Sequence, residues 1–267
     1  MGYMQDVFSG FQGVPVTHST NKRQGEVALV TGATTGIGEA VAYALADLGL
    51  SVIVSGRRID RLEAVAETIR TKGVDAHVMA CDIADASALE AMFADIRSKV
   101  GKLDILVNNA GMGYQSDIGD FETAELSLAL AVNVTGAAIC IRESIALMEH
   151  RPGTAIITVS SMAAHRVPPG GFGIYSATKH ALRAIMEALR MECVKLSSPT
   201  KIASISPGTV ATEFHKLFAR SDKDPTEKLP FERLTPEDVA RAVTFVLEAP
   251  AHVQLNEIMI RPIGQLG

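Results

Sequence analysis

From residue 26 onward, short runs rich in β-branched residues alternate with longer stretches that have apolar residues at helical spacing. Some short runs, such as 52–54 and 105–107, are apolar at successive positions, as in parallel strands covered on both faces. The pattern predicts seven strands, at 26–31, 51–55, 76–81, 105–108, 155–160, 202–206 and 257–260. It predicts six helices, at 37–49, 59–72, 87–100, 122–148, 175–197 and 235–248. This alternation indicates an α/β fold: one doubly wound, Rossmann-type parallel sheet with helices on both faces.

Two segments depart from this pattern. Residues 1–24 are largely polar and aperiodic, so we expect a flexible extension ahead of a single domain at 25–267. Asp6 and the nearby glycines and proline argue against a signal peptide. The long, charged stretch 211–234 is expected to be a substrate lid, with Phe214, Leu217 and Phe218 as the side chains that could close it.

Composition narrows the classes of partner. The 267 residues carry a formal net charge of -5, so the chain lacks the basic field that attracts nucleic acid. No apolar run approaches the roughly 18 residues that span a bilayer, so we expect no membrane segment. Three scattered cysteines, Cys81, Cys140 and Cys193, suit reduced, buried thiols in a cytoplasmic protein better than a disulfide framework or a metal site.

A glycine-rich turn follows the first predicted strand. Thr31–Gly38 reads T-G-A-T-T-G-I-G, and a helix begins within it. Glycines here allow positive φ angles and close approach of a pyrophosphate, while the helix N-terminus supplies free N–H groups. The G-x-x-x-G-x-G spacing differs from the G-x-G-x-x-G dinucleotide fingerprint, so a plain tight turn is the alternative.

Arg57 and Arg58 follow the second predicted strand, where an adenosine ribose would arrive. An acidic residue at this point would accept hydrogen bonds from a ribose diol, but no acid occurs before Asp60. A guanidinium group suits a 2′-phosphate instead. The alternative is that these arginines are solvated charges at a helix start, where cations are disfavoured unless an anion binds.

Tyr175 and Lys179 are four residues apart on one predicted helix and share a face. The cation is expected to lower the phenol pKa, so that Tyr175 could serve as a general acid towards a carbonyl or a base towards an alcohol. Ser161, at the end of the preceding strand, could hold the reacting oxygen by a neutral hydrogen bond. By itself a Y-x-x-x-K pattern is common by chance.

Four ordered motifs together make residues 25–264 resemble the short-chain dehydrogenase/reductase family. They are the glycine motif at 31–38, N-N-A-G at 108–111, Y-x-x-x-K at 175–179 and P-G-x-V-x-T at 207–212. The resemblance implies a catalytic set of Ser161, Tyr175, Lys179 and Asn133. In it, Tyr175 is the acid/base, Lys179 holds the nicotinamide ribose, and Asn133 positions a water in a proton relay. The alternative is that Asn133 is a polar core residue whose hydrogen bonds are made by its neighbours.

The resemblance also implies a set of residues that bind NADP(H). Asp82 and Asn109 match adenosine contacts, and Val210 and Thr212 match contacts to the nicotinamide carboxamide. The full set is Gly32, Thr34, Thr35, Gly36, Ile37, Gly38, Arg57, Arg58, Asp82, Ile83, Asn109, Ala110, Gly111, Tyr175, Lys179, Pro207, Gly208, Val210 and Thr212.

Three positions bear on how the family pattern applies. Ser161 lies fourteen residues before Tyr175, one more than the family spacing, and Ser160 is the fallback. Gly56 stands where NAD-specific relatives carry an acid, which favours NADP. Thr35 stands where many NADP-using relatives place a second basic residue, which points to a moderate preference.

The sequence therefore predicts an NADP-dependent oxidoreductase that interconverts a secondary alcohol or hydroxy acid with its carbonyl compound. One alternative is an epimerase or dehydratase on the same scaffold. The other is a nucleotide sensor without turnover. The stretch 256–262 resembles a subgroup acting on serine and other 3-hydroxy acids, and His165 and Arg166 could meet a carboxylate or lie exposed. The resemblance further implies a homo-oligomer, a tetramer or dimer, assembled through the helices at 122–148 and 175–197.

Overall fold

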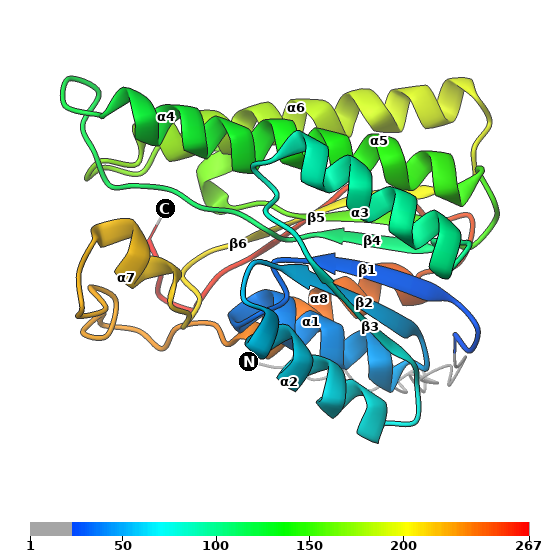
Figure 1. The fold of residues 1–267 in the computed structure, drawn as a ribbon. Coiled ribbons are helices and arrows are strands. Elements are labelled where there is room, and N and C mark those ends of the chain that lie inside the picture. Colours follow the sequence, from blue (N-terminus) through cyan, green and yellow to red (C-terminus); the bar gives the residue numbers. More distant parts are fainter. Residues whose placement is uncertain (1–22, 267) are drawn as a thin grey trace, which may run out of the picture.

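The computed structural model describes residues 23–266, which fold around one seven-stranded parallel sheet (Figure 1). The strand order is β3-β2-β1-β4-β5-β6-β7, so successive strands are added towards one edge from β1 to β3 and towards the other edge from β4 onward. All seven predicted strands are present, within two residues of their predicted ends. Their bounds are β1 Val27–Thr31, β2 Ser51–Gly56, β3 Ala76–Ala80, β4 Ile105–Asn108, β5 Ala155–Val159, β6 Lys201–Pro207 and β7 Glu257–Ile260.

Helices cover both faces of this sheet, as the pattern predicts. In Figure 1, α1, α2 and α8 lie on one side, and α3, α4, α5 and α6 lie on the other. The bounds are α1 Gly36–Asp47, α2 Ile59–Thr71, α3 Ala86–Lys99, α4 Thr123–Leu130, α5 Ala137–Met148, α6 Gly173–Lys195, α7 Phe214–Ala219 and α8 Pro236–Glu248, with a π turn η1 at Ala131–Gly136 and a 3-10 turn η2 at Met162–Ala164.

The apolar strand runs explain the two cores. In β1, Ala28 and Val30 pack with α1, α2 and α8, whereas Val27 and Leu29 pack with α3, α5 and α6. Alternate side chains point to opposite faces, so a strand buried on both sides must be apolar throughout. All five residues of β1 are buried. This double burial fixes the carboxyl ends of the strands, where the site lies.

The predicted helix at 122–148 is interrupted by η1, which separates α4 from α5. The combined stretch Thr123–Met148 is also long and apolar enough to cross a membrane by length and composition, contrary to the expectation that no segment reaches that limit. The reason is that a few polar residues interrupt its apolar runs, while its mean hydropathy stays high, at 1.7. Its buried residues, including Cys140 and Ile141, belong to the core cluster against the sheet.

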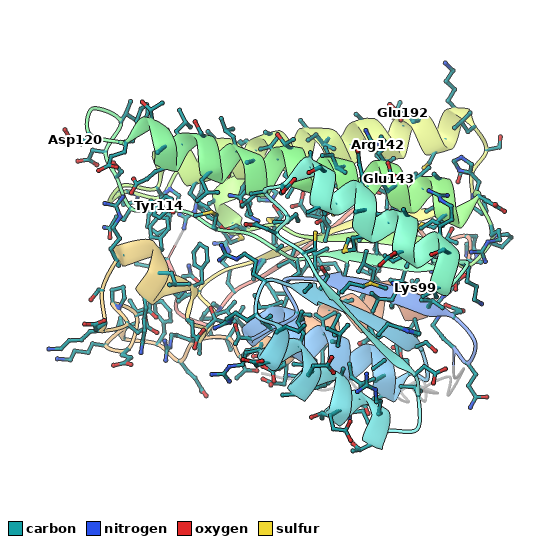
Figure 2. All side chains as sticks on the ribbon, viewed as in Figure 1. Lys99, Tyr114, Asp120, Arg142, Glu143 and Glu192 are labelled. Carbon is teal, nitrogen blue, oxygen red and sulfur yellow. The ribbon has the colours of Figure 1, made fainter. Side chains whose placement is uncertain are left out.

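Ion pairs tie α5 to α3 on the outer surface. Arg142 contacts Glu90 at 3.3 Å, and Arg97 contacts Glu143 at 3.6 Å. Figure 2 shows Arg142 and Glu143 side by side on this helix, facing the side on which α3 lies. Exposed pairs of this kind contribute little stability individually.

Most of the predicted N-terminal extension, residues 1–22, lies outside the described residues. Arg23 is described and packs against the domain, because its N–H donates to the Leu48 carbonyl at 2.8 Å and its side chain pairs with Glu26 at 3.3 Å. The three cysteines are free and buried, as predicted.

The stretch 211–234, expected to be a lid, contains the short helix α7, which the sequence pattern did not predict. The Phe218 carbonyl near the end of this helix accepts from the Gln115 N–H at 2.9 Å. The guanidinium carbon of Arg220 lies 5.2 Å from the centroid of the Tyr114 ring. Tyr114 is labelled in Figure 2, above α7. Lid motion stays a prediction.

Candidate active site and cofactor groove

A cavity of about 690 Å³ opens at the carboxyl ends of the strands. It includes the point between β1 and β4 where the strand order reverses, which is where open α/β sheets bind ligands. Of the predicted site residues, all but Gly38 and Asn133 line it: Gly32, Thr34, Thr35, Gly36, Ile37, Arg57, Arg58, Asp82, Ile83, Asn109, Ala110, Gly111, Ser161, Tyr175, Lys179, Pro207, Gly208, Val210 and Thr212.

The glycine turn is packed tightly against the N-N-A-G segment. The Asn109 side-chain amide donates to the carbonyls of Thr31 at 2.9 Å and Gly32 at 3.2 Å. At Gly38 an added Cβ would lie 2.3 Å from the Gly32 oxygen and 2.5 Å from Asn109 Nδ2. Gly38 is therefore needed for close packing behind the turn, and Asn109 braces the turn as well as lining the cavity.

The start of α1 fits a phosphate group. Its N-cap residue, Thr35, makes no side-chain capping hydrogen bond, so the first N–H groups of the helix are left for a ligand. Gly36 has a φ of 61° and faces Thr212, which an added Cβ would approach to 3.1 Å. The glycine motif and the 207–212 motif thus meet at the same point of the groove.

The two arginines after β2 differ in their surroundings. Arg58 donates to the hydroxyls of Thr34 at 3.1 Å and Thr35 at 3.3 Å, and lies 3.9 Å from the Glu213 carboxylate. Arg57 is exposed at the cavity and makes no hydrogen bond or ion pair with the residues described. Among the residues that the structure describes, Arg57 is therefore the arginine at this end of the groove whose guanidinium has no partner.

Tyr175 lies on the first turn of α6 and is 7% exposed. Burial raises the pKa of its phenol to about 12, and a hydrogen bond with Ser161 lowers it by less. This direction is opposite to the one that the Lys179 spacing predicts. The reason is that desolvation of the phenolate outweighs the cation, whose Nζ lies 5.8 Å from the ring centroid. The phenol is thus protonated at neutral pH and able to donate.

Lys179 is buried one helical turn further along α6. Burial lowers the pKa of its ammonium to about 8. Its Nζ donates to the Val159 carbonyl at the end of β5, at 3.1 Å. This contact leaves other N–H groups of the ammonium available towards the cavity.

Asn133 lies within the π turn η1, immediately behind the cavity wall. Its amide nitrogen donates to the Met112 carbonyl at 2.6 Å and Thr178 Oγ1 at 2.9 Å, and its oxygen accepts from the Met112 N–H at 2.9 Å. An added Cβ on Gly111 would lie 3.5 Å from Asn133 Oδ1 and 3.4 Å from Lys179 Nζ. The asparagine and lysine thus both lie beside Gly111. Both amide hydrogens of Asn133 have protein partners, as the core alternative expects, but its oxygen accepts only one hydrogen bond from the described residues and keeps a second acceptor position.

Phenyl rings surround Tyr175 on its other side. The ring centroids of Phe214 and Phe218 lie 5.4 and 5.8 Å from that of Tyr175, and Phe172 stacks on Phe218 at 4.4 Å. Gly113 makes room for this cluster, because an added Cβ would lie 2.7 Å from the Tyr175 ring. Of the predicted lid side chains, Phe218 is buried, whereas Leu217 is 70% exposed.

Several cavity residues, including Phe172, Glu213 and His215, lie outside the sequence motifs, and sequence reasoning missed Gln265 altogether. Burial lowers the pKa of His215, so its imidazole is neutral at neutral pH. Gln265 follows a proline-glycine turn near the C-terminus, and only that turn signal could have drawn attention to it. His165 does not line the cavity, and its Nε2 lies 2.5 Å from Glu257 Oε1, whereas Arg166 does line the cavity.

Comparison with known proteins identifies this arrangement. The family model for short chain dehydrogenases matches residues 26–223. The chain belongs to the short-chain dehydrogenase/reductase family. It is therefore an oxidoreductase by family, and its seven-stranded parallel sheet matches the fold of its structural neighbours.

Curated relatives and solved structures agree with this family. Dehydrogenase/reductase SDR family member 11 of Mus musculus is 38% identical over 249 residues, covering 90% of this chain and 95% of the relative. Farnesol dehydrogenase of Aedes aegypti is 34% identical, covering 90% and 97%. The closed form of a serine dehydrogenase complexed with NADP+ superimposes with a TM-score of 0.83 at 31% identity, covering 90% and 96%.

Proposed function

We propose that this protein is an NADP-dependent oxidoreductase that interconverts a secondary alcohol, or a hydroxy acid, with the corresponding carbonyl compound. The observation that carries the proposal is the buried Tyr175, which lines the groove together with Ser161 and lies one helical turn from Lys179. The cofactor would supply or accept a hydride when bound, since that chemistry belongs to the nicotinamide. The protein's residues orient the partners and handle the proton.

In the direction of reduction, Ser161 holds the substrate oxygen by a hydrogen bond. Tyr175 donates its phenolic proton to that oxygen as negative charge develops on it. The phenolate left behind is stabilised by the ammonium of Lys179. Asn133 and Lys179, which meet at Gly111, would return a proton to Tyr175 through a bound water. Oxidation of an alcohol runs these steps in reverse.

The choice of NADP over NAD is supported by the charge at the end of β2. Arg57 is an exposed cation without a partner among the described residues, and Gly56 places no carboxylate beside it. The structural neighbour named serine dehydrogenase is complexed with NADP+. A 2′-phosphate would accept charge-assisted hydrogen bonds from this guanidinium.

The cavity wall supports a substrate with an apolar body. Phe172 and Phe214 line the cavity beside Tyr175, and Phe218 packs against Tyr175 and these two rings. Arg166 also lines this cavity, and its buried Nε has no hydrogen-bond partner among the residues that the structure describes. The carboxylate of a hydroxy acid would pair with Arg166, and its apolar part would pack on the phenyl rings. An apolar alcohol would contact the rings alone.

The experiment that tests this function is a screen of NADPH-dependent reduction and NADP+-dependent oxidation across ketones, sugars, steroids and 3-hydroxy acids, with wild type beside Tyr175→Phe. We expect turnover by wild type on at least one class. We expect Tyr175→Phe to bind NADPH normally and to lose more than nine-tenths of kcat, since only the transferable proton is removed.

Tight NADPH binding without turnover across the panel would refute the enzyme assignment and favour a nucleotide sensor. A net change of stereochemistry or loss of water without net cofactor consumption would instead favour an epimerase or dehydratase. Retention of more than about a tenth of kcat in Tyr175→Phe, a barrier change under ~1.4 kcal/mol, would remove Tyr175 from the proton step.

We also propose a cytoplasmic homo-oligomer. The three buried free thiols suit a reducing compartment. On α6, Met191 and Val194 are 54% and 64% exposed, and such apolar side chains on a long outer helix favour contact with a second copy. Light scattering of the purified protein, which gives its mass in solution, distinguishes a monomer from a dimer or tetramer.

A further inference from the structure

The chain after β7 folds back onto the cavity. Pro262 is buried, and its carbonyl accepts from the Gln265 N–H at 3.1 Å, which closes a tight turn over Ile263 and Gly264. Gly264 has a φ of 92°, a conformation that glycine adopts without strain. The turn directs Gln265 towards the carboxyl end of β6, although its neighbours Ile263 and Leu266 are almost fully exposed.

The Gln265 side chain enters the groove beside the 207–212 motif. Its Oε1 accepts a hydrogen bond from the Thr209 backbone N–H at 3.0 Å. An added Cβ on Gly208 would lie 2.3 Å from this oxygen and 3.2 Å from Pro262. The glycine of the motif thus leaves the space that the Gln265 side chain occupies.

The Thr209 peptide is held from two sides. Its carbonyl accepts from the Leu234 N–H at 3.0 Å, and the Leu234 carbonyl accepts from the Ala211 N–H at 2.8 Å. On the other side, Gln265 is the acceptor that the described residues provide for its N–H. These contacts fix the backbone that leads into Val210, a buried residue on the cavity wall.

We infer that Gln265 is a positioning residue for the nicotinamide end of the cofactor, an inference that rests on the proposed function. Val210 and Thr212 are the residues expected to meet the nicotinamide carboxamide, which needs backbone groups held at a set angle. Gln265 sets that angle through Thr209 without taking part in the chemistry. The adenosine end of the groove, at Arg57 and Asp82, does not depend on it.

The test compares two ligands on the unmodified chain and three variants. One ligand is NADPH, and the other is 2′-phospho-ADP-ribose, which shares the phosphates and adenosine but lacks nicotinamide. Gln265→Met removes the acceptor at similar volume, Gln265→Glu keeps an oxygen acceptor, and Leu266→Ala is the neighbouring control on a 93% exposed side chain. Dissociation constants are measured by calorimetry.

We expect Gln265→Met to weaken NADPH binding about threefold to tenfold, the effect of one lost hydrogen bond, and to leave 2′-phospho-ADP-ribose unchanged. Gln265→Glu should restore most of the NADPH affinity, and Leu266→Ala should match wild type. Equal losses for both ligands would show a general structural role and overturn the inference, as would unchanged NADPH binding in Gln265→Met. If wild type bound neither ligand, the proposed cofactor itself would be refuted, a result distinct from a failure of Gln265 alone.

Discussion

Replacement of Arg57 by alanine is expected to reduce kcat/KM for NADPH by about 10- to 150-fold and to leave kcat/KM for NADH nearly unchanged. Arg57 lines the groove at the end of β2 and has no competing partner among the described residues, so its guanidinium is free for a 2′-phosphate. A hydrogen bond to a charged group contributes about 1.5–3 kcal/mol, which gives this range. Its side chain is exposed, so fold stability should change little.

Arg58→Ala is the matched control. Arg58 already contacts Thr34, Thr35 and Glu213, so a phosphate would have to compete with those partners for its guanidinium. We expect a loss below about tenfold, shared by both cofactors because Arg58 covers the glycine turn common to them. Gly56→Asp should shift preference towards NADH by placing a carboxylate beside the 2′-position.

The assay is initial-rate kinetics with both cofactors at one ionic strength, using the best substrate from the panel. A wild-type preference for NADH would refute the reasoning from Gly56 and Arg57 altogether. An unchanged NADPH/NADH ratio in Arg57→Ala, with a collapse of that ratio in Arg58→Ala, would transfer the phosphate contact to Arg58.

Three further predictions concern packing, motion and pH. Gly38→Ala should lower the free energy of unfolding by about 1–3 kcal/mol and abolish cofactor binding, whereas Gly119→Ala, with open space at its Cβ, should do neither in urea denaturation and calorimetry. Hydrogen exchange across 211–234 should slow when NADP(H) and substrate bind, and equal protection in both states would argue against a lid. Burial lowers the pKa of Lys179 to about 8, so between about pH 8 and 10.5 the unfolded state binds more protons than the folded state. The free energy of unfolding of wild type should therefore rise relative to that of Lys179→Met as the pH rises through this range. A difference between the two proteins that stays constant with pH in urea titrations would contradict this.

The sheet could be predicted because strands buried on both faces leave a strong local signal. Val52–Val54 and Ile105–Val107 are apolar at every position, and glycines and capping residues mark where the chain turns. The meeting of the motif segments at one edge was predictable for a related reason, since parallel strands bring their carboxyl ends together wherever they fall in the sequence. The roles of the motif residues, in contrast, came from the resemblance to the family. That topology gathers segments as distant as Thr31 and Val210 on one cavity.

Features set by tertiary contact were not predictable in this way. The α7 helix has only six residues, and Phe214 and Phe218 in it pack on Tyr175 rather than on the sheet. The direction of the Tyr175 pKa depends on how far the ring is buried, which spacing along a helix does not specify. Gln265 acts through a single hydrogen bond across fifty-six residues of sequence, a contact with no local pattern.

The π turn between α4 and α5 has a consequence for tolerance to insertion and deletion. A π turn accommodates one residue more than a regular α-helical turn, so deletion of one residue within Ala131–Gly136 would let the whole stretch become a continuous α-helix. Residues on either side would keep their angular positions around the helix axis, because the residue removed is the extra one, whereas residues within the turn would move to new angular positions. Asn133 would leave Met112 and Thr178, although no side chain of the cavity wall had been altered. Along this helix, chain length is therefore as much a determinant of the site as residue identity.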